Sequence, residues 1–389
     1  MTTQHKKPLR QSIEQFHEMA IAQTGLSDFG QTDYLQRLEI LLSSCDEQGQ
    51  LNNALHAFAG GVVTAALSSR LIVENNLRQH PGSAKNAIER PIIIVSMSRS
   101  GSTALHRLLA ADPNNQALEL WLAGSPMPRP PREQWNSHPV FMASRDHFAG
   151  FNENPDYKAI HEMAPELADE CVHLLFQDFA AVSLSCMINA PDFDRHLFNT
   201  DLSPCYERHR KIVQLIGTNE PHKRWVLKDP PSMPNLDQLM RVYPDACFVH
   251  IHRDPVKVIP SVCSLIQSGR VSAGAGATEH AEFIPQREMT WWPEALRRGL
   301  AARAQRPADF YDLSFTEFVR DPVASIRDIY QHFSLELTEA SLNALTHHVE
   351  THPRDKHGRH SYTPGDWGIT EGEIREQFSF YIEDYGQYL

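Results

Sequence analysis

The stretch at positions 91–113, PIIIVSMSRSGSTALHRLLAADP, constrains the fold more than any other part of this sequence. It opens with Ile92–Val95, four consecutive β-branched residues, and such a run is typical of a strand buried on both faces, as in a parallel sheet. A loop of small residues follows, and after it a helical pattern places Leu105 and Leu109 on one face. Asp112 and the proline after it should end this helix, because proline cannot continue it.

A strand that leads through such a loop into a helix N-terminus is suited to binding an anion. The N–H groups of the loop and of the first helical turn point outward, and the helix dipole favours negative charge there. Ser102 and Thr103 add hydroxyl donors, and Arg99 adds a planar cation that can hold a phosphate through two hydrogen bonds. No lysine follows Gly101, so the loop is not a Walker A motif and Mg²⁺-dependent nucleotide hydrolysis is disfavoured. An ordinary polar turn is the alternative.

Bulk composition limits the class of protein. The chain has 389 residues, of which 41% are hydrophobic and 22% charged, which suits one large globular domain with an extension, or two domains. Its net charge of −12 argues against a nucleic-acid partner. The six cysteines form no Cys-x-x-Cys pattern, as expected in a reducing compartment, so we expect a cytoplasmic protein. We see no secretory signal pattern, and no run approaches the roughly 18 apolar residues of a transmembrane segment.

The N-terminal region, residues 1–88, has a helical pattern. Leu51, Leu55 and Val62 recur at near-helical spacing, and a Pro-Gly-Ser sequence at 81–83 then breaks the pattern. We therefore expect an N-terminal helical region that packs as a layer on a main domain at 89–389. Two roles stay open for this layer: it shapes substrate access, or it is purely a scaffold.

Short apolar runs recur after position 113 and alternate with helical patterns. The runs 225–227, 247–252 and 309–315 are predicted to be strands, and 323–333 an amphipathic helix. This alternation indicates an α/β fold with a parallel sheet flanked by helices. Three further segments are predicted: a short strand at 116–121, a helix at 165–179 and a mobile loop at 268–290.

Polar side chains follow three of the predicted strands at the points where they end. Arg99 to Thr103 follow the first, Lys228 ends the second, and Arg253 with Ser261 follows the third. Ligands bind at the carboxyl ends of the strands in open parallel sheets, so one ligand touching all three would carry several negative charges. The 21 histidines form no set with cysteines or carboxylates at ligand spacing, and we expect no metal site.

The loop after the first strand resembles that of the PAPS-dependent sulfotransferases, where PAPS is 3′-phosphoadenosine 5′-phosphosulfate. The bacterial and tyrosylprotein-type members have P-R-[ST]-G-[ST]-T there, and this sequence has S-R-S-G-S-T, with Ser98 in place of the proline. The resemblance covers about residues 90–389 and implies a P-loop-like parallel sheet. It also implies that the 5′-phosphosulfate of PAPS is held by Arg99, Ser100, Gly101, Ser102 and Thr103.

Further motifs of this family occur in the same order along the chain. Arg253 and Ser261, eight positions apart across a strand-to-helix junction, match the pair that holds the 3′-phosphate. Lys228 in WVLKDPP matches the lysine that stabilises charge on the transferring sulfuryl group. The resemblance assigns three more residues to the nucleotide: Phe315 beside the adenine, and Lys356 and Arg359 at the 3′-phosphate.

The general base is the part of the site that the motifs leave most open. Family members that use histidine carry it two positions after the lysine, where this chain has Pro230. The other branch uses a glutamate shortly after the loop helix, and Glu119 lies close to that place. We therefore predict Glu119 as the base, with Asp169, Glu170 and His161 in reserve.

The resemblance implies transfer of a sulfuryl group from PAPS to a hydroxyl, leaving 3′,5′-ADP. Arg99 and Lys228 would stabilise the charge that develops on the leaving oxygen, and the scheme needs no metal. A sugar, lipid, sterol, phenol or peptide acceptor stays open, as does a homodimer. Two other functions stay open from the residues alone: a P-loop small-molecule kinase, and a non-catalytic nucleotide-binding or scaffolding protein.

Overall fold

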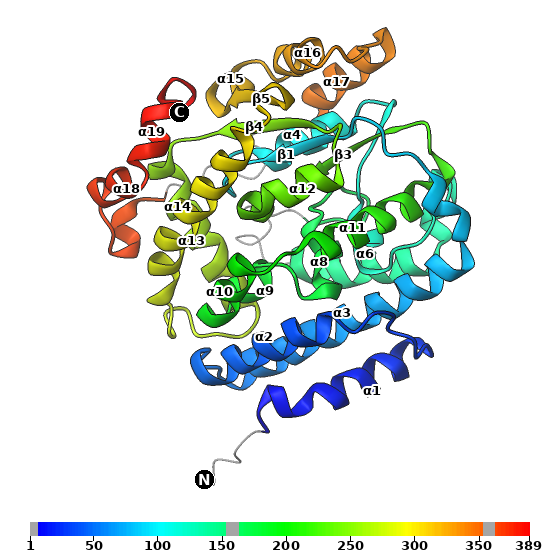
Figure 1. Cartoon of the computed structure of the whole chain (residues 1–389), viewed down its shortest axis with the longest axis vertical. Helices are drawn as coiled ribbons and strands as arrows, with labels where there is room; N and C mark the ends of the chain where they lie inside the picture. Colours follow the sequence, from blue (N-terminus) through cyan, green and yellow to red (C-terminus); the bar gives the residue numbers. More distant parts are fainter. Residues whose placement is uncertain (1–6, 153–162, 353–361) are drawn as a thin grey trace.

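The sheet at the centre of the molecule has five parallel strands in the order β2-β3-β1-β4-β5, with helices on both sides (Figure 1). The structure is a computed structural model, and it describes residues 7–152, 163–352 and 362–389. Its strands are β1 (Ile92–Val95), β2 (Asn115–Gln116), β3 (Arg224–Lys228), β4 (Cys247–His252) and β5 (Phe310–Ser314). The α/β fold expected from the sequence is confirmed.

Strand β1 is buried on both faces of the sheet, as its β-branched composition predicts. Ile93 and Val95 pack into the larger of two hydrophobic cores, and Ile92 and Ile94 pack into the smaller one. Because β1 pairs with β3 on one side and β4 on the other, the loops that follow these three strands meet at one edge of the sheet.

Two helices leave this edge directly. Helix α4 (Ser102–Ala110) follows β1 and buries Leu105 and Leu109, and α13 (Pro255–Ser272) follows β4. Asp254 caps α13 by accepting a hydrogen bond from the Val256 N–H at 2.9 Å, and the helix continues without a break past Pro260. Among the described residues, the other α-helices after β1 are α5 (Leu120–Gly124), α6 (Pro139–Asn152), α8 (Val172–Leu175), α9 (Ser183–Cys186), α10 (Pro191–Asn199), α11 (Ser203–Ile216), α12 (Leu236–Val242), α14 (Phe283–Arg303), α15 (Phe315–Arg320), α16 (Pro322–His332), α17 (Glu339–Thr351), α18 (Glu371–Gln377) and α19 (Ser379–Tyr385).

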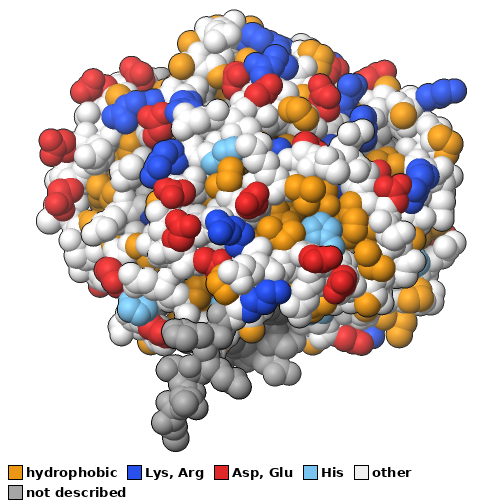
Figure 2. All heavy atoms as spheres, turned by 60° about the horizontal axis from the view of Figure 1, so that its bottom comes forward, with side chains coloured by type: hydrophobic (Ala, Val, Ile, Leu, Met, Phe, Trp, Pro, Cys, Tyr) orange, Lys and Arg blue, Asp and Glu red, His pale blue; other side chains and the backbone are white. Residues whose placement is uncertain are grey.

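From residue 7 onward, the N-terminal region forms a helical layer. Helices α1 (Ile13–Thr24), α2 (Tyr34–Gln48) and α3 (Asn53–Gln79) lie at the opposite end of the molecule from α15–α17 (Figure 1). Their apolar side chains join the same hydrophobic core as one face of the sheet. Figure 2 brings this end forward and shows acidic, basic and hydrophobic side chains interspersed on its surface.

Helix α3 is long and apolar enough, by length and composition alone, to cross a membrane. Half of its most apolar window is buried inside the molecule, which is a property that core helices of ordinary domains share. The helix also carries Arg70, which is fully buried and ion-paired with Asp178. We therefore describe α3 as a core helix of this layer.

The helix predicted over 165–179 is wrong for most of its length. Only α8 and a short 3₁₀ turn, Phe176–Asp178, are helical there. Backbone groups of the preceding residues bond instead to the chain after β2: Leu120 N donates to Leu167 O at 3.0 Å, and Asp169 N donates to Leu118 O at 2.8 Å. These long-range hydrogen bonds outweigh the local helical preference of the segment.

The same contacts shorten the strand predicted at 116–121. β2 ends at Gln116, and the residues beyond Glu119 enter α5. The loop predicted at 268–290 is also shorter, because α13 continues to Ser272 and α14 begins at Phe283. The buried Arg270 donates to Met187 O and Glu279 O, which ties the segment between these helices to the body of the protein.

Candidate active site

The loop between β1 and α4 turns sharply in a way that requires glycine at one position. Arg99 and Gly101 both have positive φ, 67° and 92°. A Cβ on Gly101 would lie 2.7 Å from Cδ2 of Phe315, closer than real Cβ contacts come. Gly101 is therefore required both for its backbone conformation and for the close approach of the Phe315 ring.

The same loop offers polar groups without partners. The hydroxyls of Ser96 and Ser100 are buried and make no hydrogen bond with any described residue. Gly101 is the N-cap of α4, and no side chain caps the helix. Buried hydroxyls and helix N–H groups normally find a partner, so this loop fits the anion predicted from its sequence.

The predicted 3′-phosphate residues lie directly against this loop. Arg99 Nε donates to Ser261 Oγ at 3.1 Å, and Arg253 Nη1 donates to the carbonyl of Arg99 at 2.7 Å. The Arg253 guanidinium also lies over the Phe315 ring, 4.2 Å from its centroid. Burial lowers the pKa of the Arg99 guanidinium. Residues that follow β1, β4 and β5 in the chain therefore converge at one place.

Lys228 reaches the same helix from β3. Its ammonium donates to Thr103 Oγ1 at 2.8 Å and forms an ion pair with Glu170 Oε1 at 2.6 Å. The Lys228 side chain is 1% exposed, whereas that of Glu170 is 24% exposed and so is accessible to a ligand. The N–H of Cys171 donates to the carbonyl of Lys228 at 2.9 Å, so the backbone beside Glu170 is fixed to the strand end.

Glu119, the predicted base, lies in a different set of contacts. Its Oε2 accepts a hydrogen bond from Arg129 Nε at 3.0 Å, and Arg129 also bonds to Glu220 and Gln116. Burial raises the pKa of Glu119, while the Arg129 guanidinium opposes this shift. The only described ion pair of Glu119 is therefore with Arg129, and among the described residues the direct carboxylate partner of Lys228 is Glu170.

Titratable groups around Lys228 have shifted pKa values. Burial raises the pKa of Asp229 to about 7, although a hydrogen bond from Ser232 opposes the shift, and the other carboxylate oxygen is buried without a described partner. Burial disfavours a charged His173, but the Asp169 carboxylate 3.5 Å away raises the pKa of His173 overall. Shifted pKa values of this kind are common at active sites that use acids and bases.

A groove of about 1430 Å³ extends along α4. It is lined by Ala104 and Leu108 of that helix, by Phe315 and by Glu119, whereas Lys228 and Glu170 are not among its lining residues. Its walls include apolar side chains such as Trp135 and charged side chains such as Arg129.

Three groups elsewhere could geometrically hold a metal ion: His250, His252 and Asp312 have ligand atoms within 4.8 Å of one another. The Asp312 carboxylate already accepts two hydrogen bonds from Arg303, at 2.5 and 2.6 Å, and a third from His252. These contacts describe a buried ion-pair network rather than a free set of metal ligands.

The structure brings together the loop residues, Lys228, Arg253, Ser261 and Phe315. Lys356, Arg359 and His161 lie outside the described residues. Sequence reasoning held Glu170 only in reserve, because its contact with Lys228 depends on the long-range pairing of 165–169, which has no local signal.

A family model described as the sulfotransferase family matches residues 91–339. The crystal structure of sulfotransferase STF1 from Mycobacterium tuberculosis H37Rv is 36% identical, with a TM-score of 0.86, and the match covers 95% of this chain and 98% of that one.

Two further relatives are more distant in sequence. The structure of sulfotransferase STF9 from Mycobacterium avium shares the fold, with a TM-score of 0.87, 23% identity and coverage of 99% and 98%. Omega-hydroxy-beta-dihydromenaquinone-9 sulfotransferase Stf3 from Mycobacterium bovis is 24% identical over 302 residues, which is 75% of each chain. The matches give no support to a kinase, and the chain belongs to the sulfotransferase family.

Proposed function

We propose that this sulfotransferase takes its sulfuryl group from PAPS and transfers it to a hydroxyl group. The observation that carries the proposal is the convergence of three strand ends, which places Arg99, Lys228 and Arg253 around one loop. The unpartnered hydroxyls of Ser96 and Ser100 support an anionic ligand at that loop.

Different residues would bind different groups of PAPS. The loop from Arg99 to Thr103 holds the 5′-phosphosulfate, and Arg253 with Ser261 holds the 3′-phosphate. Phe315 offers its ring to the adenine, and we retain Lys356 and Arg359 as further 3′-phosphate residues. The bound donor supplies an activated sulfuryl group. Arg99 and Lys228 supply fixed positive charge where negative charge grows on the leaving oxygen.

We propose Glu170 rather than Glu119 as the general base. A base must lie within hydrogen-bond reach of the acceptor hydroxyl, close to the sulfuryl group that Lys228 contacts. The 2.6 Å contact between Glu170 and Lys228 supports this position, and the partial exposure of Glu170 lets an acceptor approach it. Glu119, in contrast, forms its described ion pair with Arg129.

Calorimetry tests the donor. We expect tight binding of 3′,5′-ADP in the presence of EDTA, and much weaker binding of Mg·ATP. Transfer of labelled sulfate from PAPS should also proceed in EDTA, because the cations in this scheme are side chains. Binding of Mg·ATP but not of 3′,5′-ADP would overturn the proposal.

Two isosteric variants test the base. Glu170→Gln should lower kcat by about 10²-fold or more, because a base of this kind contributes about 10²–10⁴-fold, while leaving a folded protein that binds 3′,5′-ADP. Glu119→Gln is the matched control and should lower kcat much less. The reverse order of the two variants would return the role to Glu119.

We propose a hydroxyl on an extended, largely apolar molecule as the acceptor. The groove along α4 begins beside the loop, at Ala104, and exceeds the roughly 300–1,000 Å³ of most small-molecule pockets, so it has room for the extended part of an acceptor. The relative Stf3 is named for a lipid-like menaquinone derivative, which agrees with this class. A panel of farnesol, hexadecan-1-ol, 4-nitrophenol and glucose should show the highest kcat/KM with the long-chain alcohols; preference for glucose would contradict the proposal.

A further inference from the structure

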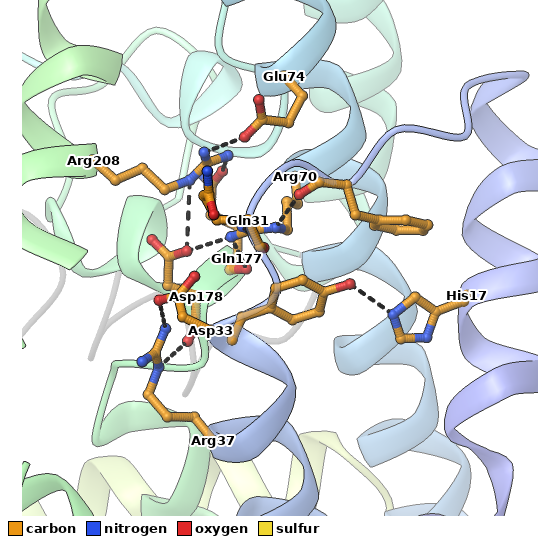
Figure 3. Close-up of polar contacts among 11 residues, drawn as sticks. His17, Gln31, Asp33, Arg37, Arg70, Glu74, Gln177, Asp178 and Arg208 are labelled. Atoms are coloured by element: carbon orange, nitrogen blue, oxygen red, sulfur yellow. Dashed lines mark hydrogen bonds and ion pairs between the residues drawn. The ribbon is translucent and has the colours of Figure 1, made fainter. Parts of the chain in front are cut away.

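The N-terminal helical layer is joined to the main domain by a buried cluster of charged side chains (Figure 3). Asp178, which follows α8, is 2% exposed and forms an ion pair with Arg70 of α3. Arg208 of α11 lies 3.5 Å from the same carboxylate oxygen, and Arg37 Nε of α2 donates to the backbone carbonyl of Asp178 at 2.6 Å. Three arginines from three helices therefore hold one residue.

Arg70 is the centre of this cluster. It is fully buried and its guanidinium lies 4.2 Å from the centroid of the Tyr34 ring. Its Nε donates to Phe29 O at 2.7 Å, and its Nη2 donates to Gln31 O at 2.6 Å. One side of the guanidinium is thus bound to the link between α1 and α2, and the other side to Asp178.

A short and rigid segment connects Asp178 with Glu170. Residues 172–178 form α8 and one 3₁₀ turn, and Leu174 N donates back to Cys171 O at 2.9 Å. The next residue, Phe179, is fully buried with a φ of 50°, an uncommon conformation for a side chain of this size that only surrounding contacts can maintain. The segment is therefore held at both ends: at Lys228 through Cys171 and Glu170, and at Arg70 through Asp178.

We propose that Arg70 is a positioning residue for Glu170, so that the N-terminal layer sets the geometry of the catalytic carboxylate. This inference rests on the proposed role of Glu170 as the base. Buried ion pairs add little net stability compared with apolar residues of the same size, because desolvation offsets their attraction. Their directional contacts do fix one arrangement, and here they fix the position of Asp178 at the far end of the segment that begins at Glu170.

Two substitutions weaken this connection while keeping the size of the side chain nearly unchanged. Arg70→Lys keeps the charge but loses the fork of donors to Phe29 O and Gln31 O, and Asp178→Asn keeps the shape but loses the charge. Arg270→Lys is the matched control, because Arg270 is also fully buried and bonded to backbone carbonyls but has no described contact with 170–178.

In the ligand-free protein, we expect hydrogen exchange at 171–178 to be at least tenfold faster in Arg70→Lys and Asp178→Asn than in wild type or Arg270→Lys. With the best long-chain alcohol as acceptor, we expect kcat per 3′,5′-ADP-binding site to fall about 10-fold to 100-fold, as for a catalytic group displaced by about 1 Å. The Kd for 3′,5′-ADP should stay within about twofold. Counting binding sites by calorimetry removes any unfolded fraction.

The double variant Arg70→Lys/Glu170→Gln separates positioning from general destabilisation. If Arg70 acts through Glu170, the double variant has the same kcat as Glu170→Gln alone. If the kcat losses of the two single variants multiply in the double variant, the inference is overturned. Unchanged hydrogen exchange at 171–178 in Arg70→Lys would also overturn it. If Glu170→Gln by itself keeps wild-type kcat, the proposed base fails instead, and the two failures are thereby distinguished.

Discussion

The guanidinium of Arg253 contacts two other parts of the site at once, the Arg99 carbonyl at 2.7 Å and the Phe315 ring at 4.2 Å. These contacts hold it in place before a ligand arrives, so little side-chain entropy should be lost when a phosphate binds. A preorganised arginine of this kind discriminates by charge and geometry rather than by shape alone.

Arg253→Ala should weaken binding of 3′,5′-ADP by roughly 10-fold to 100-fold, as expected for the loss of a charge-assisted hydrogen bond to phosphate. The same substitution should change the affinity for 5′-AMP, which lacks the 3′-phosphate, by less than about threefold. Calorimetry with both nucleotides measures the difference. Equal losses for the two would place the 3′-phosphate away from Arg253.

The pKa of Asp229 predicts how stability depends on pH. Burial raises it to about 7, from about 3.9 in an unfolded chain, so between these values the folded protein holds a proton that the unfolded chain has released. Stability should therefore fall as pH rises from about 4 to 7 and then level off. Urea unfolding at pH 5 and pH 8 should show a drop about 3 kcal/mol larger in wild type than in Asp229→Asn. Equal drops would contradict this assignment.

Part of the site could be predicted at this scale from sequence alone. The loop, Lys228, Arg253 and Ser261 each follow a strand with a local signature, and strand ends of a parallel sheet meet at one edge. The Glu170 contact could not be predicted in this way. It depends on hydrogen bonds between 118–121 and 165–169, which the residue types do not encode.

At the scale of elements, prediction succeeded where the signal was local. The β-branched run of β1 and the amphipathic pattern of α16 gave correct elements, because burial on two faces or on one face imposes a fixed period. It was wrong over 165–171, where the chain forms turns and its backbone groups bond to the chain after β2. Tertiary hydrogen bonds, rather than propensity, decide such segments.

The β1–α4 loop makes an element-scale prediction. Gly101→Ala should cost about 1–3 kcal/mol in stability and should weaken 3′,5′-ADP binding at least tenfold, because the new methyl would meet the Phe315 ring in a left-handed backbone conformation. Thermal unfolding and calorimetry measure both effects.

Gly61→Ala provides the control for this substitution. Gly61 lies within α3, and a Cβ there would meet nothing within 4 Å. Alanine should stabilise the helix by about 0.5–1 kcal/mol and leave nucleotide affinity unchanged. A similar loss of binding in both variants would show that the Phe315 approach is not the cause.

On the scale of the whole molecule, the N-terminal layer and the sheet share one hydrophobic core. Leu67 and Leu71 of α3 belong to the same cluster as Ile93 of β1 and Phe248 of β4. Because they share a core, the N-terminal layer and the sheet should unfold together rather than one after the other.

Native-state hydrogen exchange tests this coupling. The slowest amides of α3, around Leu67–Leu71, should exchange with the same free energy as those of β1 and with the same dependence on urea, since both require global unfolding. Exchange from α3 at a clearly lower free energy would show that the layer opens on its own.

The contact between Lys228 and Glu170 has a consequence for the enzyme at rest. The ammonium of Lys228 is already paired with the carboxylate of Glu170, so an incoming nucleotide must compete with this carboxylate for Lys228. Glu170→Gln removes this competing carboxylate, so it should raise the affinity for nucleotide while it lowers kcat. Part of the free energy of nucleotide binding is thus used to displace Glu170 from Lys228. This lowers the affinity for the product 3′,5′-ADP and favours its release.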